Sequence, residues 1–156
     1  MVSQQLKREI VIEAPPEIVW DAVTEPEQMA LWFGDAVDFD LHPGGTGTMT
    51  WQPGGRATEE LAEPITIPLQ IEEIDPPRLF SFRWTHPADS EATPANSLLV
   101  EFALVPEGDA TRLSVTESGF AEIERDTEAE VDGHEEGWKV HLESLRRYAA
   151  GVAAAR

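Results

Sequence analysis

The periodicity of apolar residues changes once along this chain. Up to about residue 118, most segments alternate apolar and polar residues, as in Ser97–Val105 and Thr111–Ser118. Alternation with period two is typical of strands that bury one face. Beyond that point, apolar residues recur at helical spacing: Trp138, Leu142, Leu145, Ala149 and Val152. Because the strands follow one another without helices between them, the pattern predicts an antiparallel sheet followed by one long amphipathic helix, which is an α+β fold.

Two short helices are expected near the N-terminus, after a first strand at Leu6–Glu13. A proline pair at 15–16 ends that strand, and proline suits the first turn of a helix. Thr24 and Glu27 have the spacing of a capping box, in which each side chain caps the backbone of the other residue. The sequence therefore predicts one helix that begins at the proline pair and a second that runs from this capping box to about Phe33.

Further strands are predicted in the middle of the chain, between turn signals rich in proline and glycine. They comprise Val37–Leu41, Thr46–Trp51, Ile65–Ile74, Leu79–Trp84, Ser97–Val105 and Thr111–Ser118. Pro68 lies inside one of them and cannot donate a backbone hydrogen bond, so we expect it at a sheet edge or at a bulge. Residues 86–96 form a predicted loop that is long enough to cover a site.

The start of the C-terminal helix has two alternatives in the sequence. Residues 127–130 and residues 132–135 each have the pattern of a capping box, and nothing in the sequence chooses between them. Gly133 and Gly137 fall in the first turns of this helix. Glycine costs ~1 kcal/mol relative to alanine inside a helix. We therefore expect a local reason for both glycines, such as close backbone approach or a bend.

Composition excludes several classes of function. The 156 residues include 11 Lys+Arg and 30 Asp+Glu, which gives a net charge of −19. Such a field repels phosphates, so nucleic acid and anionic lipid surfaces are not expected partners. The absence of cysteine excludes disulfides, thiolate metal sites and cysteine nucleophiles. No apolar run approaches the ~18 residues of a membrane span, and no signal-peptide pattern is visible, so we expect a cytoplasmic protein.

Five stretches of the chain together resemble a known family. They are IVIEAPPEIVWDAVTEPEQMALWF (10–33), PGGTGTMTWQPGG (43–55), IEEIDPPRLFSFRW (71–84), TRLSVTESGF (111–120) and GWKVHLESLRRY (137–148). In this order they resemble the START-like, polyketide-cyclase-like (SRPBCC) superfamily, and within it the branch named after the C-terminal domain of activators of the heat-shock protein 90 ATPase. The resemblance implies a single START-like domain over residues 1–156 with a helix-grip fold, in which a curved antiparallel sheet wraps the long C-terminal helix. It also implies a cavity for apolar ligands between the sheet and that helix.

The residues expected to face this cavity combine the inward faces of the strands with the apolar stripe of the helix. They are Trp32, Phe33, Met49, Trp51, Phe82, Trp84, Val100, Phe102, Glu117, His134, Trp138, His141 and Leu142. Many of these residues also suit an ordinary packed core. We predict a small apolar, aromatic or lipid-like molecule as the ligand, and no cofactor.

Glu117 is the most informative polar residue among them. It is in phase with Leu113 and Val115, which predicts that its carboxylate points inward. A carboxylate in that position needs a partner, a wet cavity or a strand end. Glu117 and His134 are also the candidates for acid–base catalysis, although no catalytic motif surrounds them. His134 and His141 are two helical turns apart, ~10 Å along the axis, which is too far to share one metal ion, so no metal site is predicted.

Three functions remain as hypotheses at this stage. The first is a module that binds a small apolar molecule between sheet and helix. The second is a polyketide-cyclase-like enzyme that acts in the same cavity. The third, suggested by the resemblance, is a co-chaperone-like modulator of an ATPase. The sequence does not identify a protein partner.

Overall fold

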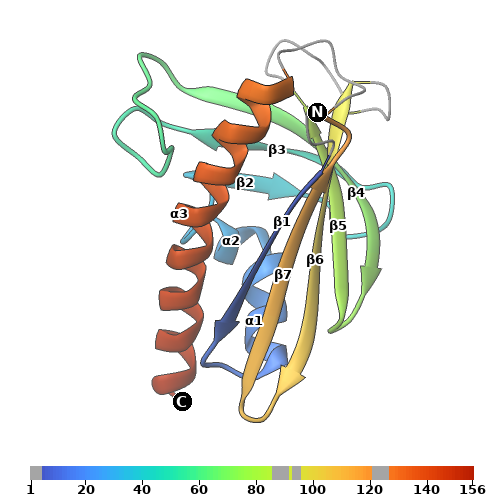
Figure 1. Ribbon diagram of the computed structural model, residues 1–156, viewed down its shortest axis with the longest axis vertical. Coiled ribbons are helices and arrows are strands. Elements are labelled where there is room, and N and C mark those ends of the chain that lie inside the picture. The colour runs from blue at the N-terminus through green and yellow to red at the C-terminus, as the bar shows by residue number, and fades with distance from the viewer. Residues whose placement is uncertain (1–4, 86–91, 93–95, 121–126) are drawn as a thin grey trace.

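The described residues form one antiparallel sheet of seven strands, in the order β1-β7-β6-β5-β4-β3-β2 (Figure 1). The computed structural model describes residues 5–85, 92, 96–120 and 127–156. Its strands are β1 (Gln5–Ile12), β2 (Ala36–Phe39), β3 (Thr46–Trp51), β4 (Ile65–Asp75), β5 (Leu79–Thr85), β6 (Ser97–Glu107) and β7 (Ala110–Ser118). From β2 to β7, strands that follow one another in sequence are also neighbours in the sheet, and β1 closes the far edge beside β7.

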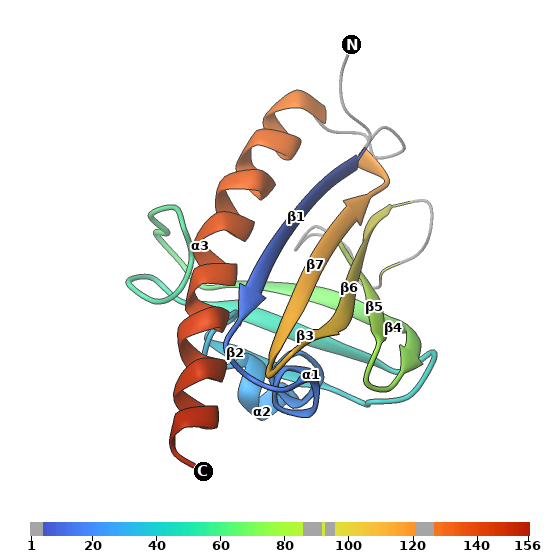
Figure 2. The ribbon, with the colours of Figure 1, turned by 60° about the horizontal axis from the view of Figure 1, so that its bottom comes forward.

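The long helix α3 (Thr127–Ala154) lies across the curved sheet, so the predicted α+β helix-grip fold is confirmed (Figure 2). The helix begins at Thr127, the earlier of the two predicted starts. The stripe that it buries is close to the expected one and comprises Val131, Trp138, Leu142, Leu145 and Ala149. Within the described residues, no helix is both long enough and apolar enough to cross a bilayer.

The helices α1 (Pro16–Thr24) and α2 (Pro26–Met29) carry the chain from β1 at one edge of the sheet to β2 at the other (Figures 1 and 2). Each begins with proline in its first turn, as expected. The predicted capping box is wrong, because the Thr24 hydroxyl donates to the backbone carbonyl of Trp20 at 2.7 Å, within α1. The second helix is also shorter than predicted: it ends at Met29, and turns carry the chain on to Phe33.

Pro68 lies near the start of β4, where its described pairing is with β3. Pro68 pairs with Thr48 of β3, whereas the described register between β4 and β5 begins only at Leu69. The residues that directly follow Thr85 lie outside the described part of the chain, so the edge position of Pro68 stays a prediction. The loop predicted at 86–96 lies almost entirely outside the described residues.

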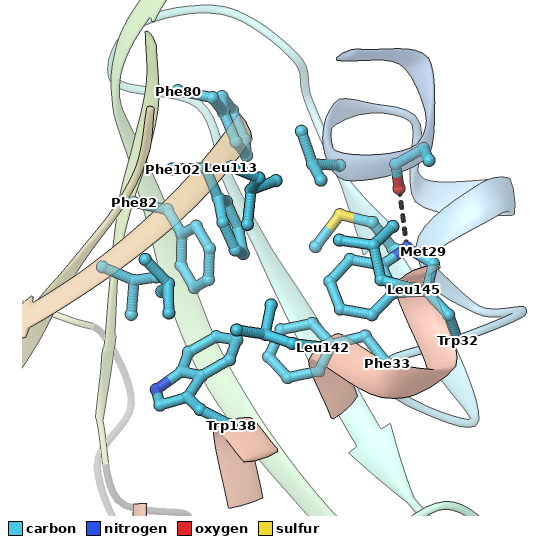
Figure 3. Packing of buried hydrophobic residues seen from close by; sticks show 14 of the residues in the cluster. Met29, Trp32, Phe33, Phe80, Phe82, Phe102, Leu113, Trp138, Leu142 and Leu145 are labelled. Atoms are coloured by element: carbon cyan, nitrogen blue, oxygen red, sulfur yellow. Dashed lines mark hydrogen bonds between the residues drawn. The ribbon is translucent and has the colours of Figure 1, made fainter. Parts of the chain in front are cut away.

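The core forms where the inward faces of the strands meet α3 and the segment that follows α2 (Figure 3). Phe80, Phe82 and Phe102 project from β5 and β6, and each is at most 1% exposed. They face Trp138 of α3 and the stacked rings of Trp32 and Phe33. Burying one such side chain contributes ~1.5–3 kcal/mol. These contacts fix α3 and the segment that follows α2 relative to the sheet, and so they also fix the walls of the cavity described next.

Candidate functional site

A cavity of about 650 Å³ opens where the first turns of α3 pass the ends of the central strands. The connection between β3 and β4, residues 52–64, forms one side of it, and Figures 1 and 2 show this connection projecting beside α3. The aromatic part of the lining is Phe33, Trp51, Trp84 and Trp138, and the titratable part is Glu59, His134, Glu136 and His141. A volume of this size lies within the ~300–1,000 Å³ range of pockets that hold small molecules.

The aromatic side chains form a continuous wall rather than a set of separate rings. The ring centroids of Phe33 and Trp138 are 5.2 Å apart, and those of Trp84 and Trp138 are 5.8 Å apart. Trp51 extends the wall, with its centroid 6.1 Å from that of Trp84. Its indole N–H also donates to the backbone carbonyl of Phe33 at 3.1 Å. The wall is therefore held in shape by its own ring contacts before any ligand enters.

Glu117 of β7 lies behind this wall, completely buried. The indole nitrogens of Trp84 and Trp138 donate to its two carboxylate oxygens at 2.7 and 2.9 Å. The imidazole Nδ1 of His134 lies 2.8 Å from Oε1. Because an indole nitrogen can only donate, both oxygens act as acceptors, an arrangement that suits an ionised carboxylate. Glu117 thus has the partners that its inward position requires, and it links β7 to β5 and α3.

His134 connects this buried carboxylate with the cavity, because its side chain lines the cavity and is 27% exposed. A carboxylate only accepts hydrogen bonds, so the ring hydrogen sits on Nδ1, facing Glu117. The ring also meets Trp84 and Phe120 edge to face, with centroids 5.8 and 5.5 Å away. Its orientation is therefore determined from several sides. A histidine oriented by a carboxylate is an arrangement suited to proton transfer.

His141, one turn beyond Trp138, lines the same cavity but differs in its electrostatics. It is 7% exposed, and burial lowers its pKa to about 4. A hydrogen bond with the backbone of Trp32 and the charge of Asp35 partly oppose this decrease in the pKa, whereas the charge of Arg56 adds to it. The imidazole of His141 is therefore neutral at pH 7. In the part of the chain that the structure describes, no three His, Cys, Asp or Glu side chains are placed to hold a metal ion.

The connection between β3 and β4 is anchored by Asp35, a residue that the sequence analysis did not single out. The Asp35 carboxylate accepts the backbone N–H of Gln52 at 2.7 Å and that of Arg56 at 3.1 Å. A Cβ at Gly55 would lie 2.2 Å from this carboxylate, so any larger residue there would displace the Asp35 side chain. The anchored segment places Ala57–Leu61 along the cavity. The signal in the sequence was the turn motif Pro53–Gly55, which predicts a turn but not the side chain that holds it.

The thirteen residues predicted to face a ligand fall into two groups in the structure. Those that line the cavity are Phe33, Trp51, Trp84, His134, Trp138 and His141. Those that lie in the packed interior, outside the described lining, are Trp32, Met49, Phe82, Val100, Phe102, Glu117 and Leu142. The reason is that the interior is filled beneath Trp138 (Figure 3), whereas the described cavity lies at the end of the sheet where α3 begins. Sequence reasoning did not place Gly133, Gly137 or the β3–β4 connection in the lining.

Solved structures of related shape show how widely this fold occurs. A protein from Nitrosomonas europaea has a TM-score of 0.73 and 20% identity, over 97% of both chains. An Hsp90 activator from Plasmodium falciparum has a TM-score of 0.67 and 17% identity, over 92% of this chain and 94% of its own. DynU16, a protein from the dynemicin biosynthetic locus, has a TM-score of 0.70 and 21% identity over 94% of this chain, which spans only 47% of DynU16. At these identities the likeness establishes the fold alone.

Sequence comparison identifies the family. A search of curated proteins found no significant match. The profile of the family described as "Activator of Hsp90 ATPase homolog 1-like protein" matches residues 13–150, which is nearly the whole chain and agrees with the resemblance noted in the sequence. The chain therefore belongs to the Activator of Hsp90 ATPase homolog 1-like family.

Proposed function

We propose that this protein binds a small apolar or aromatic molecule in the cavity between α3, the strand ends and the β3–β4 connection. The observation that carries the proposal is an aromatic-walled cavity of about 650 Å³. Pockets that bind small molecules are typically apolar, with a few polar groups that orient the ligand. Here the wall of Phe33, Trp84 and Trp138 would supply apolar contact, and His134 would supply a polar one.

The charges around the cavity favour an uncharged ligand over an anionic one. Glu59 and Glu136 are exposed side chains of the lining, and among the described lining residues there is no lysine or arginine to balance a ligand carboxylate. His141 is neutral, since burial lowers its pKa to about 4. The net charge of −19 adds repulsion at long range. Fatty-acid anions are therefore weaker candidates than neutral ring compounds.

Two measurements test the proposal. Native mass spectrometry of the purified protein, followed by extraction, is expected to release a reproducible small molecule at one per chain. Titration with Nile red, an uncharged fluorescent ring compound, is expected to saturate at one site. The substitution Trp51→Leu is expected to weaken Nile red binding roughly tenfold, because loss of part of the aromatic wall costs about 1.4 kcal/mol.

Trp20→Leu is the matched control for that variant. Trp20 is also partly buried and also packs against a phenylalanine, Phe80, but it lies outside the described lining of the cavity. We expect it to leave the affinity for Nile red unchanged. A bare mass together with no saturable binding of Nile red to the wild-type protein would reject the binding function.

A catalytic function is the second candidate, and the hydrogen bond between Glu117 and His134 is the observation that favours it. In this hypothesis His134 moves a proton to or from a polyketide-like ligand, while Glu117 orients the imidazole from behind the wall. A model reaction is exchange of the methyl hydrogens of acetophenone for deuterium in D₂O, followed by NMR. We expect His134→Gln to abolish any acceleration and the exposed His42→Gln to retain it; equal acceleration by wild type and His134→Gln would remove His134 from catalysis.

The co-chaperone hypothesis is supported by the family description and by the fold that this chain shares with the Plasmodium Hsp90 activator. It predicts that the purified protein raises the ATPase rate of Hsp90. An unchanged ATPase rate, together with no retention of Hsp90 by the immobilised protein, would reject it.

A further inference from the structure

Two glycines one turn apart, Gly133 and Gly137, lie on the face of α3 that borders the cavity. The sequence predicted that close backbone approach or a bend would explain them. Close approach is wrong, because a Cβ built on either glycine would meet no described heavy atom within 4 Å. Gly133 is exposed and Gly137 half-buried; a Cβ at either position would face open space, and both residues are part of the cavity lining.

The backbone does not require glycine at these positions. Both residues lie inside α3 with ordinary helical geometry, unlike Gly44, Gly54 and Gly108, which adopt positive φ in turns. Glycine is a poorer helix former than every residue except proline. Two glycines in consecutive turns therefore weaken the start of α3 without easing any steric conflict among the described residues. What they do provide is room beside the aromatic wall.

The neighbouring residues show where this room lies. His134, Trp138 and His141 border the cavity from the same helix, and Ala57 and Thr58 border it from the β3–β4 connection. The sides of the cavity beyond the aromatic wall are thus made partly of small residues. A larger side chain at position 133 or 137 would project into the volume that a ligand needs.

We propose that Gly133 and Gly137 determine the width of the cavity and so admit a bulky, uncharged ring compound that larger residues at these positions would exclude. This inference rests on the proposed binding function. The glycine positions are specificity-determining: they set an upper limit on ligand size, while the aromatic wall supplies most of the contact. A side chain at either position excludes large ligands and leaves room for small ones.

The experiment compares Gly137→Leu and Gly133→Leu with Gly151→Leu, using Nile red as the large probe and fluorobenzene, followed by ¹⁹F NMR, as the small one. Gly151 lies in the same helix, and a Cβ there also meets nothing within 4 Å, but it is outside the described lining of the cavity. We expect the first two variants to lose at least tenfold in affinity for Nile red and to keep their affinity for fluorobenzene. Gly151→Leu is expected to bind both probes as the wild type does.

Stability separates a filled cavity from a damaged fold. Leucine is a better helix former than glycine, so all three variants are expected to have a Tm at or above that of the wild type. Gly137→Ala adds only a methyl group and is expected to raise the Tm with a smaller loss of affinity for Nile red. Unchanged binding of Nile red by both Gly137→Leu and Gly133→Leu would overturn the inference, as would an equal loss in Gly151→Leu. If the wild type binds neither probe, the binding function itself fails.

Discussion

Replacing Glu117 by glutamine tests the buried hydrogen-bond network most directly. The carboxylate accepts hydrogen bonds from Trp84 at 2.7 Å, from Trp138 at 2.9 Å and from His134 at 2.8 Å. A glutamine side chain has nearly the same shape but keeps only one acceptor oxygen. Whichever way its amide turns, the NH₂ group faces at least one indole N–H, and an indole nitrogen cannot accept a hydrogen bond. At least one buried donor therefore loses its partner.

The size of the expected loss in stability follows from the burial of the two indole donors. Trp84 and Trp138 are residues that are only 8% and 2% exposed, so water cannot readily replace the lost acceptor. An unsatisfied buried donor costs ~1–3 kcal/mol. Breaking a buried charged network costs ~3–5 kcal/mol. Part of this cost is offset here, because a neutral glutamine loses less hydration free energy on burial than a carboxylate does. We expect Glu117→Gln to lower the free energy of unfolding by about 2–3 kcal/mol.

Urea-induced unfolding at pH 7, followed by far-UV circular dichroism and tryptophan fluorescence, measures this change. Glu101→Gln is the matched control: Glu101 is half-exposed on the neighbouring strand β6, and we expect its variant to stay within about 0.5 kcal/mol of the wild type. In the wild type, the indole protons of Trp84 and Trp138 should exchange slowly with solvent, and Glu117→Gln should accelerate that exchange. A Glu117→Gln protein as stable as the control, with unchanged indole exchange, would refute the account of the network.

Three further predictions concern the surroundings of the cavity and the contact between α3 and α2. The pKa of His141 is about 4 in the folded protein, against an ordinary value of 6.5. As the pH falls, the unfolded chain therefore binds a proton at this histidine before the folded protein does. The free energy of unfolding should fall by about 3 kcal/mol between pH 6.5 and pH 4. Urea titrations across that range should show this dependence, and it should disappear in His141→Leu. Gly55→Ala should displace the Asp35 carboxylate and speed trypsin cleavage in the β3–β4 connection, whereas an unchanged cleavage rate would contradict the anchor. Tyr148→Phe removes the 2.9 Å hydrogen bond that the Tyr148 hydroxyl donates to the side-chain oxygen of Gln28 in α2. Urea denaturation should show a free energy of unfolding that is lower by ~0.5–1.5 kcal/mol, and an unchanged value would show that water replaces the bond.

The local pattern of the sequence was sufficient to predict the elements and their buried faces. The alternation in β5 placed Phe80, Phe82 and Trp84 on one face, and all three are buried. The helical spacing of Trp138, Leu142 and Leu145 likewise predicted the buried stripe of α3, which is at most 2% exposed at these positions. Periodicity succeeds here because the side-chain direction repeats with the backbone geometry of each element. The predicted capping box was wrong because a nearer acceptor competes for the same hydroxyl: Thr24 donates to a backbone carbonyl within α1 instead of capping α2.

The site, by contrast, depends on residues that are distant in sequence. The phase of β7 predicted that Glu117 points inward, but its indole donors come from positions 33 residues before it and 21 residues after it. The Asp35 anchor of the β3–β4 connection likewise joins residues 17 and 21 positions apart. The position of the cavity follows from how completely α3 fills the space above the sheet at each turn. Periodicity along one element determines which side chains point inward, whereas the volume left between them depends on the packing of all the elements together, and only the tertiary structure decided where that volume lies.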